Sequence, residues 1–168
     1  MFQIRNSVLR DAVDVAKIHV RAWQESYVGI VDDNYLDNLS FKDKLALREK
    51  ILTSNSQNEL HLVVVCDDEI IGFCDAGKDF STANGVGGLY AIYLLDKYKG
   101  HKLGLQLFNQ VKQHFHVLGV SKFIAWVLKN NASAGEFYAK LGGKIIDGKQ
   151  VLIGGKLYSE ICFIFTTD

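Results

Sequence analysis

The sequence predicts a mixed α/β protein in which helices flank one central sheet. Segments with a strand pattern and segments with a helical pattern follow one another along the chain, without a linker, an internal repeat or a low-complexity tract. The length of 168 residues and the hydrophobic content of 48% fit one domain that can bury a core without disulfides. We therefore expect a single domain over residues 1–168.

The N-terminal part predicts one short strand and three helices. Residues 2–6 alternate as a strand does, and Ser7 is a suitable N-cap for a helix that runs to about Tyr27. Residues 31–52 predict a short helix, a turn near Ser40 and a further helix. The first helix has one apolar face, with spacings of three and four residues, made of Ala12, Val15, Ala16, His19, Ala22 and Trp23.

The rest of the chain predicts six strands and two helices. The segment 89–95 is apolar on both faces, as a central strand is. In chain order the pattern predicts a polar loop over 54–59, a hairpin over 60–66 and 70–79 with its turn at 67–69, a loop over 81–88, a strand over 89–95, a helix over about 102–118, a strand over 122–128, a short helix capped by Asn131 and ended by glycine, and strands over 144–148 and 156–165.

The composition excludes several classes of function. Nineteen Lys and Arg residues balance nineteen Asp and Glu residues, so we expect no nucleic-acid partner. The apolar runs are too short to cross a bilayer and the N-terminus lacks a signal-peptide pattern, so we expect no membrane partner. Three cysteines, an odd number inside strand-like runs, are typical of reduced thiols in a cytoplasmic protein.

Common catalytic motifs are absent from the sequence. It contains no GxxxxGK[ST], no HExxH, no paired CxxC and no GxSxG. His114 and His116 are two residues apart in a predicted helix and would point in different directions. We therefore expect no metal site.

The segment 98–104 joins a predicted strand to an amphipathic helix and has the pattern of an anion site. Cations at a helix start are disfavoured by the macrodipole, so an anionic ligand would explain them. A plain turn before a solvated helix face is the alternative. Two glycines that let the backbone approach a ligand, and three cations near the free N–H groups of the first turn, make up the pattern: Gly100, Gly104, Lys99, His101 and Lys102.

A second segment, 131–142, follows the next buried strand. If the strands that precede the two segments are parallel neighbours, both helix N-termini lie at the same end of the sheet, where α/β proteins bind ligands. The two segments would then share one cleft. Four residues of the second segment fall on one helical face: Ala134, Phe137, Tyr138 and Leu141.

Together these segments resemble the GNAT N-acetyltransferase superfamily. Its acetyl-CoA signature, [RQ]-x-x-G-x-[GA] after a strand, falls on residues 99–104. Residues 131–142 match a second element, N-x-x-A-x-x-F-Y-x-x-L-G, in full, and residues 23–29 match W-x-x-x-Y-x-G of one subgroup. The resemblance covers nearly the whole chain. It implies a mostly antiparallel sheet of six to seven strands with a parallel pair in the middle, flanked by helices, and it allows a homodimer.

The resemblance also implies a cofactor site for acetyl-CoA, with no metal. The pantetheine arm would pair with the backbone of Ile92, Tyr93 and Leu94 as an added strand does. The remaining cofactor residues that it implies are Lys99, Gly100, His101, Lys102, Leu103, Gly104, Asn131 and Phe137.

Two positions depart from the signature. Lys99 replaces Arg or Gln, so it keeps a charge but lacks the bidentate fork of Arg. Lys102 replaces a glycine. We expect Lys102 to adopt ordinary helical backbone, to keep its N–H and to pair its ammonium with a phosphate. Coenzyme A should still bind.

The resemblance assigns Tyr138 as the general acid, because a phenol can protonate the leaving thiolate. A core tyrosine on an apolar helical face is the alternative. Relatives often carry a glutamate base where this chain has Gly88. The base therefore stays open among Glu25, Asp75, His19 and a water held by backbone and Tyr90, with a buried structural role the more usual one for a histidine on an apolar face.

The function implied is transfer of an acetyl group from acetyl-CoA to a primary amine by direct attack. The acceptor would be a small-molecule amine or a peptide amine. Trp23, Tyr27 and Tyr90 would line its pocket, although aromatic core residues are the ordinary alternative. Two other functions fit the pattern: a non-catalytic acyl-CoA-binding module, and an unrelated domain that binds a phosphate ligand through residues 98–104 alone.

Overall fold

The computed structural model describes residues 1–54, 56–78 and 85–168. The loops expected over 54–59 and 81–88 fall partly outside these residues, at position 55 and at positions 81–84. The described residues form β1 (Phe2–Asn6), η1 (Leu9–Asp11), α1 (Ala12–Tyr27), α2 (Asp33–Asp37), α3 (Phe41–Thr53), β2 (Glu59–Cys66), β3 (Glu69–Lys78), β4 (Gly87–Leu94), η2 (Asp96–Tyr98), α4 (Leu103–Val117), β5 (Lys122–Leu128), α5 (Ala132–Lys140), β6 (Lys144–Ile153) and β7 (Lys156–Thr166).

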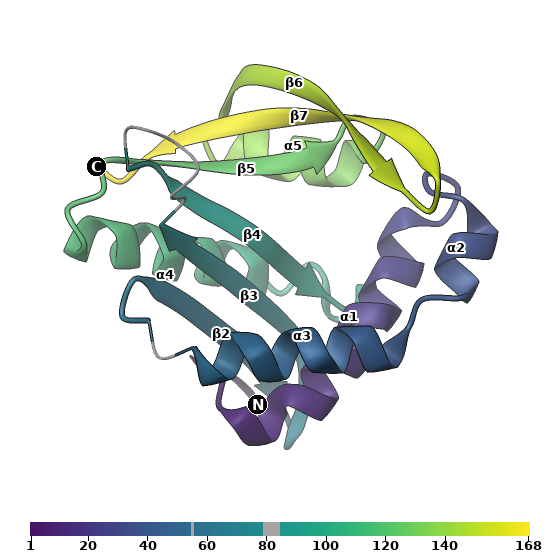
Figure 1. Cartoon of the computed structure of the whole chain (residues 1–168). Coiled ribbons are helices and arrows are strands. Elements are labelled where there is room, and N and C mark those ends of the chain that lie inside the picture. The colour runs from purple at the N-terminus through teal and green to yellow at the C-terminus, as the bar shows by residue number, and fades with distance from the viewer. Residues whose placement is uncertain (55, 79–84) are drawn as a thin grey trace.

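One seven-stranded sheet organises the fold (Figure 1). Its strand order is β1-β2-β3-β4-β5-β7-β6, and every neighbouring pair is antiparallel except β4 with β5. The predicted mixed fold, with a parallel pair in the middle of a mostly antiparallel sheet, is confirmed.

Helices cover both faces of this sheet (Figure 1). On one face, Val15 and Ile18 of α1 pack against Val63 of β2 and Phe73 of β3. On the other face, α4 and α5 cover the larger core. The apolar stripe of α4 is completely buried there and consists of Leu103, Leu107, Val111 and Phe115.

The predicted N-cap at Asn131 is confirmed and the cap predicted at Ser7 is wrong, while Ser40, where only a turn was expected, is the N-cap of α3. The Ser40 and Asn131 side chains accept hydrogen bonds from backbone N–H groups of the first turns of α3 and α5. The chain after β1 instead forms the short helix η1, and α1 begins at Ala12. Asp11 holds this turn, because its carboxylate pairs with Arg5 at 2.6 Å and accepts the Val8 N–H at 2.8 Å.

The parallel strands β4 and β5 stay together over a very short distance. They pair only at Gly87 with Phe123 and at Gly88 with Ile124. Gly87 allows α4 to pack closely on β4, since a Cβ there would lie 2.6 Å from the ring of Phe115. Beyond Gly88 the strands separate, and a bulge at Tyr90 adds one residue to β4 opposite β3. The edge of β4 that faces β5 is therefore left open.

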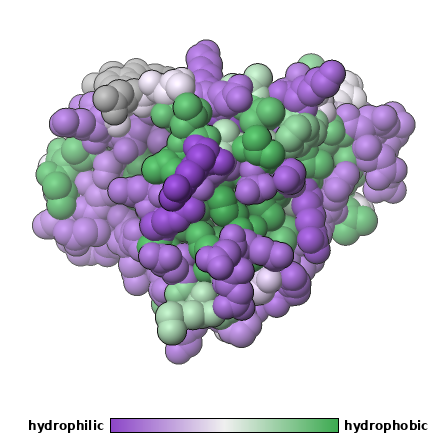
Figure 2. Space-filling model, turned by 90° about the horizontal axis from the view of Figure 1, so that it is seen from below, coloured by the Kyte–Doolittle hydropathy of each residue, from purple (hydrophilic) through white to green (hydrophobic). Residues whose placement is uncertain are grey.

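The face of the molecule shown in Figure 2 is mostly hydrophilic. Seen from below, hydrophobic residues appear mainly in the middle of the face and hydrophilic residues around it (Figure 2). None of the described helices is long and apolar enough to cross a membrane.

Strand β6 extends to Ile153, five residues beyond the end expected at Gly148, because its pairing with β7 continues to the turn.

Candidate functional site

A cleft of about 850 Å³ opens where β4 and β5 separate. Its walls come from β4, β5 and the N-terminal turns of α4 and α5. Both segments singled out in the sequence, 98–104 and 131–142, contribute residues to it. The prediction that they share one cleft is confirmed, because the parallel strands bring both helix N-termini to the same end of the sheet.

The free edge of β4 forms the floor of this cleft. Six consecutive residues from Leu89 to Leu94 line it, including the predicted Ile92, Tyr93 and Leu94. On its other edge β4 is paired with β3. Backbone donors and acceptors that face the cleft can therefore pair with an extended ligand as with another strand.

The predicted anion site divides into residues that line the cleft and one that does not. Lys99, Gly100, Lys102, Leu103 and Gly104 line it. The Lys99 ammonium is paired with Asp96 at 2.5 Å. The ring of His101 is not among the lining groups and packs on Phe2, with 5.0 Å between ring centroids.

The expectation for the backbone of Lys102 is wrong. Lys102 has φ of +60° and is the N-cap of α4, not its first helical residue. A side chain in this left-handed region is strained, whereas glycine adopts it freely. Glycine suits this position of the family signature because it adopts the left-handed backbone conformation without strain. At position 104, glycine is needed for packing, since a Cβ there would lie 3.2 Å from the ring of Phe137.

Lys102→Gly is expected to raise the free energy of unfolding by about 0.5–1 kcal/mol, because relief of left-handed strain of about 1–2 kcal/mol exceeds the added entropy of the unfolded chain. Urea denaturation measures this change. Lys102→Ala is the matched control: it removes the ammonium but keeps the strain, so it should not stabilise the protein. Equal stability of the two variants would contradict the strain.

The second segment places α5 against the same cleft. The Asn131 side chain accepts the Ala134 N–H at 3.1 Å and starts the helix, and Ser133 lines the cleft beside it. Phe137 lines the cleft, and its ring packs next to Gly104. The start of α5 therefore faces the cleft together with the start of α4, and both helix N-termini carry partial positive charge.

Tyr138 is both a core residue and a cleft residue. Its side chain is 6% exposed and packs on the rings of Phe137, Phe163 and Phe165. It also lines the cleft. Burial raises the pKa of Tyr138, with smaller contributions from Cys74 and Tyr27. The phenol therefore stays protonated far above neutral pH and can act as a proton donor.

Two of the three side chains considered as general bases, Glu25 and Asp75, are engaged in ion pairs and hydrogen bonds. Glu25 lines the cleft, but it pairs with Arg21 at 2.8 Å and accepts the Asp96 N–H at 2.8 Å. Asp75 is buried between Arg48 and His61.

His19 is buried against the ring of Tyr93, and burial, reinforced by the charges of Lys44 and Arg48, lowers the pKa of His19 to about 3. Its imidazole is therefore neutral at ordinary pH and is a weak base. Glu25, Asp75 and His19 are all poorly suited to take a proton from an amine in the cleft.

A smaller pocket of about 240 Å³ continues the cleft toward α1. Trp23, Tyr27 and Tyr90, the predicted acceptor residues, line it, and the hydroxyls of Tyr27 and Tyr93 are hydrogen-bonded at 3.1 Å. The residues that line both the pocket and the cleft are Tyr27, Leu89, Tyr90, Tyr93 and Trp126.

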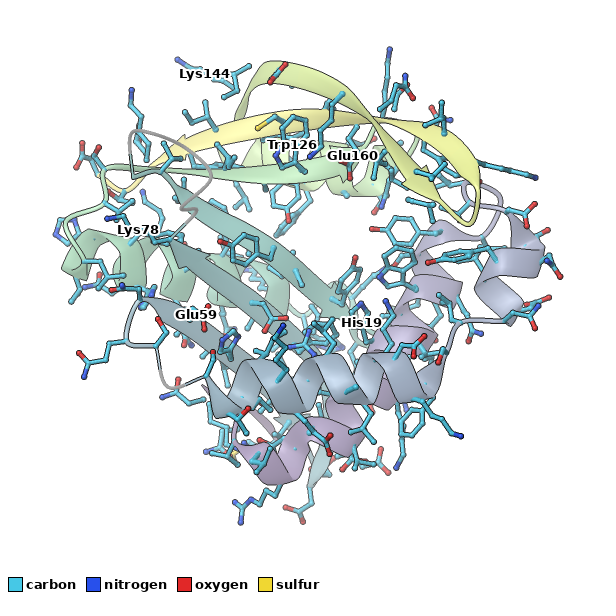
Figure 3. All side chains as sticks on the ribbon, in the orientation of Figure 1. His19, Glu59, Lys78, Trp126, Lys144 and Glu160 are labelled. Carbon is cyan, nitrogen blue, oxygen red and sulfur yellow. The ribbon has the colours of Figure 1, made fainter. Side chains whose placement is uncertain are left out.

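Trp126 and Glu160 are pocket residues that the sequence analysis missed. Trp126 lies inside the buried-looking strand β5, and Glu160 is the charged residue directly before the apolar run 161–165. Figure 3 labels both side chains, beside strands β5 and β7. A carboxylate within an apolar strand is the signal that could have indicated Glu160.

The residues present fit coenzyme A. The open edge of β4 suits an extended arm with amide groups, and two helix N-termini with the lysines Lys99 and Lys102 suit a pyrophosphate. Among residues 1–54, 56–78 and 85–168, no three His, Cys, Asp or Glu side chains are grouped to hold a metal ion. These features define a class of mixed α/β proteins whose cleft accepts an extended ligand with an anionic end.

Comparisons with known proteins identify the family. Residues 16–143 match the model of the acetyltransferase (GNAT) family. An uncharacterized N-acetyltransferase, YuaI, of Bacillus subtilis is 31% identical over 137 residues, which span 79% of this chain and 75% of the relative. The chain therefore belongs to the GNAT family and is an acetyltransferase that uses acetyl-CoA.

Two further proteins are similar to this chain, one in sequence and one in fold. The spermidine N(1)-acetyltransferase of Thermoplasma acidophilum is 22% identical over 148 residues, covering 86% of this chain and 89% of the relative. The crystal structure of the PaiA N-acetyltransferase from Thermoplasma acidophilum, in complex with coenzyme A, superposes with a TM-score of 0.75 at 24% identity, covering 95% of this chain and 98% of that one.

Proposed function

We propose that this protein transfers the acetyl group of acetyl-CoA to a primary amine by direct attack. The observation that carries the proposal is the open edge of β4, which runs between two helix N-termini and meets the Tyr138 side chain in one cleft. The relative that acts on spermidine supports a small-molecule amine as the acceptor.

Each part of the cofactor has residues suited to it. The backbone of Ile92, Tyr93 and Leu94 would pair with the pantetheine arm, and one of these N–H groups would also face the developing oxyanion. The backbone N–H groups at the start of α4 would bind the pyrophosphate, together with the Lys102 ammonium. Asn131 and Phe137 shape the side of the cleft formed by α5.

The reaction needs one bond made and one broken. The amine nitrogen attacks the thioester carbonyl carbon, the C–S bond breaks, and the thiolate takes the proton of the Tyr138 hydroxyl. The amine loses one proton to water, which also restores the proton on Tyr138. Because Glu25, Asp75 and His19 are engaged or weakly basic, we assign the base to a water molecule held near Tyr90 and the β4 backbone.

Calorimetry with acetyl-CoA, followed by a thiol-release assay on a panel of primary amines, tests the proposal. Binding in the micromolar range and amine-dependent thiol release are expected, in keeping with ordinary cosubstrate affinities of about 1 μM to 1 mM. Binding without thiol release for any amine would favour the non-catalytic acyl-CoA-binding module. Absence of binding would contradict the cofactor site as a whole.

A further inference from the structure

The ammonium group of Lys149 occupies a cation site beside the smaller pocket. The Lys149 ammonium of β6 lies over the ring of Trp126, 4.0 Å from its centroid, and 3.7 Å from the carboxylate of Glu160. Lys149 and Glu160 are directly opposite each other in the β6–β7 ladder, and Glu160 is opposite Leu128 of β5. The sheet therefore presents an aromatic face and a carboxylate side by side.

The pocket is built from aromatic rings around one charge. Among the residues that the structure describes, Glu160 is the only charged one that lines it, and its side chain is 17% exposed. Tyr27 lines the same pocket as Glu160, and burial raises the pKa of Tyr27, the hydrogen bond with Tyr93 lowers it and the Glu160 charge raises it. The other pocket rings are those of Trp23, Tyr90, Tyr93 and Trp126.

This arrangement favours an ammonium group over other ligands. A cation over an indole ring is attracted by the ring quadrupole, and a partly desolvated carboxylate strengthens the attraction through a charge-assisted hydrogen bond. A ligand carboxylate would instead be repelled by Glu160. The position of Lys149 shows directly that a primary ammonium on an alkyl chain fits between Trp126 and Glu160.

Lys149 can leave this position at low cost. Its side chain is 49% exposed and lies on β6, an edge strand of the sheet. An exposed lysine pair contributes little to stability, because water replaces the lost contacts. Trp126 also lines the cofactor cleft, so a cation that replaces Lys149 would lie next to the place of acetyl transfer.

We propose that Trp126 and Glu160 form a subsite for a second ammonium group of the acceptor, and that Lys149 holds this subsite until the acceptor displaces it. The acceptor class is then an aliphatic diamine or polyamine, with one amine in the cofactor cleft and another between Trp126 and Glu160. This inference rests on the proposed amine acetylation and deepens it. The alternative is an acceptor with an anionic end that pairs with Lys149.

Three acceptors of matched length separate these alternatives: 1,5-diaminopentane, pentylamine and 5-aminopentanoate. For the wild type, kcat/KM should be about 30-fold higher with the diamine than with pentylamine, and lowest with 5-aminopentanoate, as expected for one charge-assisted contact. Highest activity with 5-aminopentanoate, lost in Lys149→Ala, would overturn the proposal in favour of an anionic acceptor end.

Two variants test the residues themselves. Glu160→Gln should lower kcat/KM about 30-fold for the diamine and far less for pentylamine, since only the diamine uses the carboxylate. Lys149→Ala should lower KM for the diamine about threefold, because the internal competitor is gone. Glu49→Gln on α3 and Lys144→Ala, which lies on β6 away from Glu160 in Figure 3, are the matched controls and should behave as the wild type.

Different experimental results would overturn the diamine subsite and the proposed acetyltransferase function. Equal losses with all three acceptors in Glu160→Gln would mean that Glu160 acts on the reacting amine, and would overturn the subsite. If the wild type acetylates no amine, the proposed function fails, and calorimetry of 1,5-diaminopentane with the coenzyme A-loaded protein decides on the subsite. Binding that weakens about tenfold in Glu160→Gln supports it, and absence of binding overturns it.

Discussion

Tyr138→Phe is expected to lower kcat about 100-fold or more while changing the Kd for coenzyme A less than about threefold. The variant keeps the ring that packs on Phe137, Phe163 and Phe165, so the core stays filled. It removes only the hydroxyl that is proposed to protonate the leaving thiolate. Steady-state thiol release and calorimetry with coenzyme A measure the two quantities.

Tyr98→Phe is the matched control for this prediction. It also removes one phenolic hydroxyl, but Tyr98 lies in η2 and is not among the residues that line the cleft. Because burial raises the pKa of Tyr138, the wild-type rate should not fall between about pH 8 and 10 through loss of the Tyr138 proton. Unchanged turnover in Tyr138→Phe would remove this residue from the mechanism.

Arg48→Ala is expected to lower the free energy of unfolding by about 3–5 kcal/mol, because it leaves the Asp75 carboxylate without its main partner. The two side chains are 4% and 6% exposed, and their two hydrogen bonds measure 2.8 and 2.5 Å. This pair joins α3 to β3, the strand beside β4. Thermal denaturation should show a Tm lower by about 10 °C.

The effect of Arg48→Ala should depend on pH. Burial alone would raise the pKa of Asp75, but hydrogen bonds with His61 and Arg48 bring it below the usual value. The contribution of Asp75 is therefore complete above pH about 4 and is lost as the pH falls through its lower native pKa. The difference from the wild type should shrink in acid.

A matched control for this pair is available on the surface. Lys17→Ala removes the partner of Asp14 in an exposed pair, so it should cost less than about 0.5 kcal/mol. A loss of similar size in Lys17→Ala and Arg48→Ala would contradict the importance of burial.

The order of helices and strands follows from interactions between residues close in the chain, and these can be predicted from the sequence. Strands β1 and β5 have the predicted bounds, α5 begins after the predicted cap Asn131, and α3 begins after the turn expected near Ser40. Caps and alternation act between residues close in the chain, so they are visible without the fold. The end of β6 was not predicted, because its pairing partner is a strand later in the chain.

The candidate site was likewise predictable only where its residues follow patterns along the chain. The sequence patterns at 98–104 and 131–142 predicted one shared cleft, and residues of both segments line it. The smaller pocket was only partly predictable. Its aromatic residues Trp23, Tyr27 and Tyr90 came from the N-terminal pattern and from β4, whereas Trp126 and Glu160 became its neighbours through pairing of β5 with β7.

The mixed α/β class, the family and the two helix N-termini at the cleft were thus predictable from patterns along the chain. The fold alone sets which charged groups meet. It pairs Lys99 with Asp96, buries Asp75 between Arg48 and His61, and sets Lys149 against Glu160. The physical reason is that an ion pair depends on distance in space, and apart from short helical spacings the sequence does not state which charges meet.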